Sequence, residues 1–236
     1  MTYSIKCRLF FDLCNMSITT NLEGFKSQIE ERVTLVAVSK RKPVEDIREA
    51  YDFGQRDFGE NHVQEMCEKQ PLFPDDMRWH FIGHLQSNKV KYIAPFIHLI
   101  HGVDSLKLLK EISKRAIGSA RVIDCLLQIK ISEEETKYGL DEDEIDGLLG
   151  LEEFISLKGV RIVGLMGMAS NSNDDQLVRQ EFDQLQLLFS RLKRSIQAPH
   201  KMEFLSMGMS GDFPLALSAG SNMIRVGSGI FGARNN

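Results

Sequence analysis

A run of uncharged, mostly β-branched residues, Val33 to Ser39, leads directly into Lys40. The run is short and has no helical period, which is typical of a strand buried on both faces of a parallel sheet. Pro43 then begins a pattern with helical spacing, and proline is tolerated in the first turn of a helix. This stretch predicts a buried strand with a lysine at its carboxyl end.

The same alternation of short apolar runs and helical patterns continues to the end of the chain. The predicted strands cover residues 33–40, 57–60, 78–83, 97–103, 121–130, 160–166, 202–205 and 223–226, and the predicted helices cover 20–31, 43–53, 61–69, 86–93, 105–117, 141–156, 174–195 and 212–219. Strict alternation with short loops favours an α/β fold with a parallel sheet. Eight such units fit a single (β/α)8 TIM barrel of the smallest size, about 200 residues. A doubly wound open sheet is the alternative.

The chain shows no linker or composition shift between residues 16 and 236, which predicts one domain over that range. Residues 1–15 contain the apolar run Leu9-Phe10-Phe11, closely flanked by Arg8 and Asp12. This run is too short for the core of a signal peptide. We expect residues 1–15 to be an N-terminal extension, either disordered or an artefact of the assigned start.

Composition indicates which kinds of partner and which cellular compartment to expect for this protein. The net charge is −4 and no basic stripe is present, so nucleic acid is not an expected partner. The four cysteines are scattered without CxxC spacing, which favours a reducing compartment and gives neither a disulfide framework nor a zinc site. No apolar run approaches the length of a membrane span. We expect a cytoplasmic monomer without membrane or nucleic-acid partners.

In a (β/α)8 barrel the active site lies where strands end, and phosphate is often held after strands seven and eight. Lys40 ends strand one, which neighbours strand eight in a closed barrel. Partial burial lowers the pKa of an amine and makes it a better nucleophile toward carbonyl groups. The alternative is a solvated lysine, because most lysines are exposed.

Two glycine- and serine-rich segments follow the last two predicted strands, Ser206–Asp212 and Gly227–Gly232. Free backbone N–H groups at a helix start favour an anion, although the first segment alone also fits a turn with Ser210 or Asp212 as the helix cap. The second matches G-x-G-x-x-G, but no second strand or acidic residue follows it, so a phosphate cradle is favoured over a dinucleotide site.

Arg225 lies within strand eight, two residues before Gly227. A guanidinium in a barrel strand needs an acceptor, and a salt bridge at the barrel rim is the simple alternative. Pyridoxal 5′-phosphate (PLP) offers a group for each feature: an aldehyde for Lys40, a phosphate for the cradle and a ring nitrogen for Arg225. Another phosphorylated aldehyde or ketone would use the lysine and cradle but leave Arg225 without a ring nitrogen.

Several blocks in order along the chain resemble the YggS/PROSC family, the pyridoxal phosphate homeostasis proteins: Val38–Lys40, Phe58–Asn61, Trp79–Lys89, Gly164–Met166, Leu205–Ser210 and Ile224–Ser228. The resemblance runs from about residue 20 to the end. It implies a barrel similar to the N-terminal domain of bacterial alanine racemase, with PLP held as a Schiff base on Lys40. It also implies that Arg225 faces the pyridine nitrogen, that Ser210, Gly227 and Ser228 bind the phosphate, and that Asn61 and Met166 lie near the cofactor.

The resemblance implies a PLP carrier or regulator in vitamin B6 and amino acid homeostasis, with PLP-dependent apo-enzymes as possible partners and no firm catalytic activity. Arg225 would keep the ring nitrogen unprotonated and weaken the electron sink. A small amino-acid racemase or lyase is the alternative function. Such an enzyme needs a group opposite Lys40, and Tyr138 is the candidate, although a surface loop position is expected for it. His80 and His84 have poor zinc spacing, and His98 and His101 are expected to be barrel-layer or rim residues on strand four.

Overall fold

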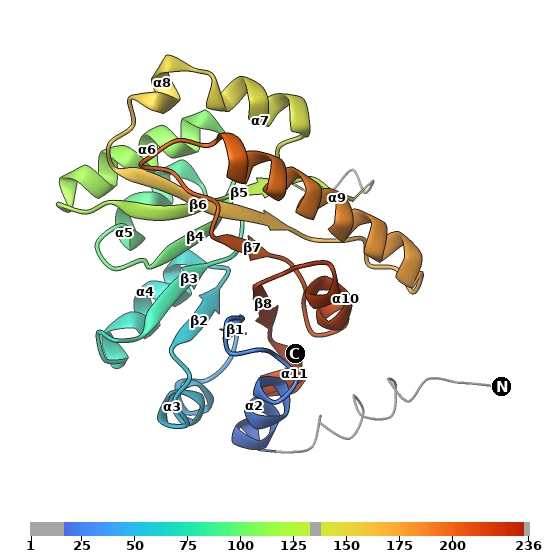
Figure 1. Cartoon of the computed structure of the whole chain (residues 1–236). Coiled ribbons are helices and arrows are strands. Elements are labelled where there is room, and N and C mark those ends of the chain that lie inside the picture. The colour runs from blue at the N-terminus through green and yellow to red at the C-terminus, as the bar shows by residue number, and fades with distance from the viewer. Residues whose placement is uncertain (1–16, 133–137, 234–236) are drawn as a thin grey trace.

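The computed structural model describes residues 17–132 and 138–233, so the predicted extension over residues 1–15 lies outside the described chain. Its strands run parallel in the closed order β1 to β8, and β8 pairs with β1 (Figure 1). The predicted TIM barrel is confirmed. The strands are β1 (Thr34–Val38), β2 (Asp57–Glu60), β3 (Arg78–Phe81), β4 (Leu99–Val103), β5 (Ile123–Ile129), β6 (Val160–Gly167), β7 (Phe204–Ser206) and β8 (Met223–Val226).

Helices lie outside the ring of strands (Figure 1). They are α2 (Ile18–Lys26), α3 (Val44–Asp52), α4 (Val63–Lys69), α5 (Val90–Ile93), α6 (Leu106–Gly118), α7 (Glu142–Leu149), α8 (Glu152–Ile155), α9 (Asp175–Ser195), α10 (Phe213–Ser218) and α11 (Ser228–Phe231). The last helix packs against α2, so the two ends of the described chain meet.

Side chains alternate between two cores because successive residues of a strand point to opposite faces. In β1, Leu35 and Ala37 join the large cluster between strands and helices. Val36 instead joins a small apolar cluster inside the barrel with Leu99, Leu126, Val163, Met166 and Met223. The barrel interior is therefore a packed core, and residues in step with Val36 line its axis.

Three helix predictions differ from the structure. The first helix begins at Ile18, because Ser17 caps it by accepting from the Thr20 backbone N–H, and it ends at Lys26. The predicted helix 141–156 divides into α7 and α8 around Gly150. The predicted helix 86–93 is a 3₁₀ turn over Ser87–Lys89 followed by the single turn of α5.

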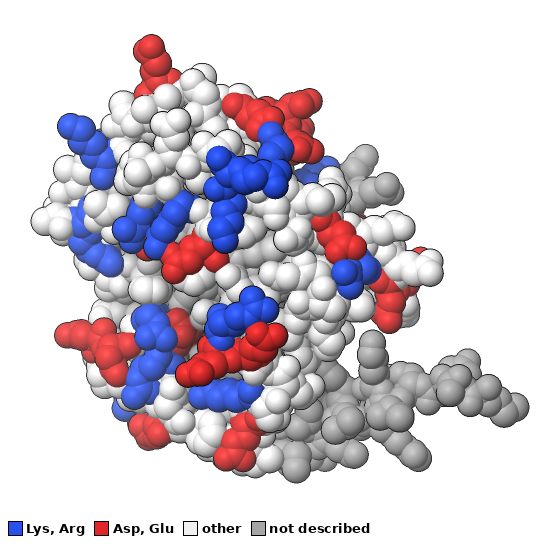
Figure 2. Space-filling model, viewed as in Figure 1, with Lys and Arg blue, Asp and Glu red and all other residues white. Residues whose placement is uncertain are grey.

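On the face shown in Figure 2, basic and acidic side chains of the described residues alternate, and no continuous basic stripe crosses it. Among the helices of residues 17–132 and 138–233, none is long and apolar enough to cross a membrane.

Candidate functional site

Lys40 lies at the carboxyl end of the barrel, just after β1. The β1–β2 ladder continues one residue past the strand, since the Ser39 N–H donates to the Gly59 carbonyl at 3.0 Å. Lys40 lies four residues after Val36, an even spacing along the strand direction, and is half-buried. Alternation along the strand therefore places Lys40 on the interior side of the barrel mouth.

A buried ionic cluster holds both neighbours of Lys40. Lys69 Nζ donates to the Ser39 carbonyl at 2.8 Å, to Glu60 Oε1 at 2.8 Å and to Glu65 Oε1 at 2.6 Å. The Ser39 hydroxyl also bonds Glu60 Oε1, at 2.7 Å, and the Arg41 N–H donates to Glu65 Oε1. Burial raises the pKa of the Glu60 carboxyl, against the opposing effect of Lys69.

The backbone at Arg41 adopts a φ of +58°, in the left-handed region that non-glycine residues rarely occupy. This turn directly follows Lys40. The cost of the turn is offset by the hydrogen bond from the Arg41 N–H to Glu65. The ionic cluster and the turn together fix the backbone on which the Lys40 side chain stands.

Arg225 is buried inside the barrel, and its strand pairs with β1 so that Arg225 lies opposite Val36. Nη1 donates to the Ser206 carbonyl at 2.9 Å and to Ser206 Oγ at 2.7 Å, and Nη2 donates to the Gly167 carbonyl at 3.1 Å. Burial lowers the pKa of the guanidinium to about 10, so it stays charged at neutral pH. The simple alternative of a rim salt bridge does not describe this arginine, because these three bonds end on neutral oxygens.

The loops after β7 and β8 meet at two serines. Ser228 Oγ lies 3.5 Å from Ser210 Oγ, and the Gly229 N–H donates to Ser210 Oγ at 3.4 Å. A Cβ atom on Gly227 would lie 3.3 Å from Val38 Cβ, so a larger residue there would press on β1. Two hydroxyls and the start of α11 therefore converge beside the strand that carries Lys40.

Asn61 and Met166 differ in what they offer. Asn61 follows β2, and its buried Oδ1 has no hydrogen-bond partner among the described residues. Met166 lies in β6 opposite Ser206, with 1% of its surface exposed, inside the apolar cluster of the barrel. Asn61 can accept a hydrogen bond from a bound molecule, whereas Met166 packs beneath the site.

The donor set fits PLP. The half-buried amine suits an aldehyde, the paired hydroxyls of Ser210 and Ser228 suit a phosphate, and a guanidinium has five N–H donors, of which Arg225 uses three in the bonds above. The orphaned Oδ1 of Asn61 is a further sign that this mouth is built to receive a polar ligand.

Tyr138 stacks on His84 at the barrel mouth, with ring centroids 4.4 Å apart and planes inclined by 21°. Its side chain is 59% exposed, as expected for a surface loop. Gln128 Nε2 donates to the Tyr138 carbonyl at 2.8 Å, which ties this loop to the interior of β5.

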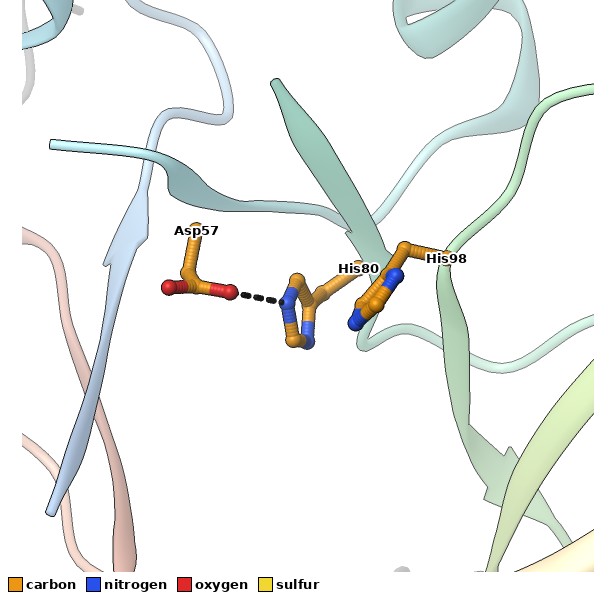
Figure 3. A group of neighbouring side chains, drawn as sticks. All are labelled: Asp57, His80 and His98. Atoms are coloured by element: carbon orange, nitrogen blue, oxygen red, sulfur yellow. Dashed lines mark hydrogen bonds and ion pairs between the residues drawn. The ribbon is translucent and has the colours of Figure 1, made fainter. Parts of the chain in front are cut away.

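Asp57, His80 and His98 have the residue types of a metal site, with ligand atoms within 4.8 Å of one another (Figure 3). Each Asp57 oxygen already accepts from Arg78, at 2.7 and 2.6 Å, and His80 Nε2 lies 3.0 Å from Asp57 Oδ1. A cation would have to displace both partners. Asp57 begins β2 and His80 lies within β3, so the group is on the far side of the barrel core from Lys40. His98 precedes β4 instead of lying on it.

Sequence reasoning missed Ser206 and Lys69 as functional residues. Ser206 belongs to one of the blocks that carry the family resemblance, and a polar residue in an otherwise apolar strand was its signal. Lys69 ends a helical pattern, and lysine is a residue type usually found on the surface, yet only 6% of this residue is exposed. No local pattern distinguishes such a lysine from a solvated one.

The chain matches the family model described as alanine racemase, N-terminal domain, over residues 15–235. It is 39% identical to the pyridoxal phosphate homeostasis protein of Vibrio alginolyticus, over 93% of this chain and 98% of that one. PipY of Synechococcus elongatus superposes with a TM-score of 0.85 at 38% identity without PLP, and of 0.82 at 37% with PLP bound. Both alignments cover 91% of this chain and 100% of PipY. The chain therefore belongs to the alanine racemase N-terminal domain family and, within it, to the pyridoxal phosphate homeostasis proteins.

Proposed function

We propose that this chain binds PLP as a Schiff base on Lys40 and acts in the cytoplasm as a monomeric carrier or regulator of PLP, in vitamin B6 and amino acid homeostasis. The single observation that carries the proposal is the half-buried Lys40 after β1, which pairs with β8, the strand that holds Arg225 and precedes Ser228. The PLP-bound structure of PipY, a relative with 37% identity, supports the same ligand.

Each residue has a separate part in holding the cofactor. Ser210, Ser228 and the backbone at Gly227 would hold the phosphate, Arg225 would donate to the pyridine nitrogen, and Asn61 would accept from a polar group of the ligand. When bound, PLP supplies an electron sink for chemistry at an amino acid's α-carbon.

The character of Arg225 argues against transamination and suits either a carrier or racemase-like chemistry. A donor whose pKa stays at about 10 keeps the ring nitrogen unprotonated at neutral pH. An unprotonated ring withdraws electrons less strongly, which argues against transamination. PLP-dependent apo-enzymes are the partners that such a carrier would serve.

The test is an absorption spectrum with added PLP for the parent protein and for Lys40→Ala. Lys130→Ala is the matched control, because Lys130 follows β5 as Lys40 follows β1 and is exposed. We expect a near-visible band that borohydride fixes onto Lys40, that Lys40→Ala loses and that Lys130→Ala keeps. An equal band in the parent and Lys40→Ala would refute the proposal.

A small racemase or lyase is the second candidate, favoured by the position of Tyr138 at the barrel mouth. Its test is exchange of the α-proton and chiral turnover over a panel of amino acids, with Tyr138→Phe as the variant. Turnover that falls in Tyr138→Phe would favour the enzyme. Stoichiometric transfer of PLP to an apo-enzyme without turnover would favour the carrier.

A further inference from the structure

We propose that Asp57, His80, His101 and Ser206 form a directed hydrogen-bond chain through the barrel that positions Arg225. The chain joins the amino ends of the strands to the residue beneath the candidate cofactor site. Its positions rise along the barrel: Asp57 begins β2, His80 and His101 lie within β3 and β4, and Ser206 ends β7. The effect on the cofactor rests on the proposed PLP function, whereas the existence of the hydrogen-bond chain does not.

Four consecutive contacts connect the five groups. His80 Nε2 lies 3.0 Å from Asp57 Oδ1, as the dashed line in Figure 3 marks, and His80 Nδ1 lies 3.0 Å from His101 Nε2. His101 Nδ1 lies 3.2 Å from Ser206 Oγ, which accepts from Arg225 Nη1 at 2.7 Å. These residues are buried, with 9% or less of the surface of each exposed, so water competes little for these bonds.

With one proton on each imidazole, the two ends set a single direction for every bond. Arg225 can only donate, and an ionised carboxylate can only accept. The pKa of Asp57 is held well below its usual range by hydrogen bonds from Arg78 and His80, against the opposing effect of burial. Burial also holds the pKa of His101 well below its usual value, so this ring is neutral and carries one proton.

With one proton on each ring, one arrangement satisfies all five groups at once. Arg225 donates to Ser206, whose hydroxyl donates to His101 Nδ1; His101 Nε2–H donates to His80 Nδ1, and His80 Nε2–H donates to Asp57. A proton on His101 Nδ1 would instead point at Ser206 Oγ and leave the serine hydroxyl hydrogen without this acceptor. The chain therefore predicts that both histidines carry their proton on Nε2.

The hydrogen-bond chain links the buried Arg225 guanidinium to a distant anion, the Asp57 carboxylate. The guanidinium bonds described above end on neutral oxygens, and each bond of a chain polarises the next toward the Asp57 carboxylate. Ser206 Oγ is thereby oriented as an acceptor, and the guanidinium is held in one plane. The N–H groups that these bonds leave unused are presented in a defined direction to a ring nitrogen.

The first experiment reads the protons directly in the protein without added PLP. Long-range ¹⁵N–¹H NMR of the imidazoles assigns the protonated nitrogen of each ring. We expect Nε2–H for both His80 and His101. A proton on His101 Nδ1 would overturn the proposal, and this measurement needs neither PLP nor any substitution.

The second experiment measures PLP affinity in chain variants. His101→Leu removes donor and acceptor, and we expect it to weaken PLP binding about tenfold, the effect of one lost hydrogen bond. His101→Gln keeps one donor and one acceptor and should restore most of the affinity. His200→Leu is the matched control, since His200 accepts from the Ile162 N–H and stacks on Phe154 outside the chain.

The outcomes separate this proposal from the proposed function. Equal affinities in the parent and His101→Leu, or equal losses in His101→Leu and His101→Gln, would overturn the positioning role. If the parent shows no Lys40-dependent band, the proposed PLP function fails. The NMR assignment of the imidazole protons still decides whether the hydrogen-bond chain exists. If His101→Leu does not fold, Ser206→Ala takes its place, with Ser113→Ala, a buried serine bonded to the Gly159 N–H, as its control.

Discussion

Lys69 shows how one buried side chain organises the site from outside it. Its ammonium bonds Glu60, Glu65 and the Ser39 carbonyl, and its own side chain is only 8% exposed. A buried pair of this kind contributes little net stability, but removing one partner leaves the other charge buried without compensation. Lys69 thus links the stability of the fold to the position of Lys40.

At this scale we predict that Lys69→Met lowers the free energy of unfolding by about 3–5 kcal/mol, because Glu60 is left buried without its cation. Urea denaturation measures the change. The matched control is Lys110→Met, which breaks an exposed pair with Glu153 and should change the free energy by less than about 1 kcal/mol. Similar losses in the two variants would contradict a buried role for Lys69.

At the scale of elements, β6 and β7 approach closely at Gly164. A Cβ atom on Gly164 would lie 1.8 Å from the Phe204 carbonyl oxygen, which belongs to the backbone and cannot move aside. The pairing of β6 with β7 matters for the site because it also places Met166 beside Ser206, the acceptor of Arg225. One glycine therefore allows the register on which Arg225 depends.

We predict that Gly164→Ala lowers the free energy of unfolding by at least about 2 kcal/mol, the cost of forcing a methyl group into a packed core. Gly118→Ala is the matched substitution, because Gly118 ends α6 with open space around it. Alanine there should leave stability unchanged or raise it by up to about 1 kcal/mol. Thermal unfolding of the two variants compares them, and a tolerated Gly164→Ala would show that β6 and β7 can separate without loss.

The elements also show where local patterns mislead. The sequence predicts one helix over 141–156, whereas α7 ends at Leu149 and α8 starts at Glu152. The helix at 86–93 failed similarly, since Ser87–Lys89 forms a 3₁₀ turn. Gly150 caps α7 and marks the first break, a signal that the spacing of apolar residues does not carry.

At the scale of the whole molecule, the buried polar groups of the barrel link stability to pH. His101 is fully buried, and burial lowers the pKa of its imidazole well below the usual value. An unfolded histidine titrates near 6.5, so below this pH the unfolded chain binds protons that the folded chain does not. The stabilisation is complete above pH 6.5 and declines as the pH falls below that value.

We predict that the free energy of unfolding decreases steadily from pH 7 to pH 4.5, measured by urea denaturation at each pH. His101→Gln should reduce the slope, because glutamine does not titrate. Asp57 adds a loss at lower pH only, since its pKa is lowered and its stabilisation persists until the unfolded carboxyl protonates near 3.9. Equal slopes for the parent and His101→Gln would contradict the burial of a neutral His101.

The sequence by itself determined the barrel and its family, because strand and helix periods and the order of the blocks are local properties of the chain. It also indicated Lys40 and Arg225 at adjacent strands. Only the tertiary structure decided that Lys69 is buried and that Ser206 is the acceptor of Arg225. It alone also showed that His80 and His101 connect Ser206 to Asp57. These contacts join residues 9 to 105 positions apart. Burial and hydrogen-bond partners at such separations depend on how the barrel closes, which no window of the sequence contains.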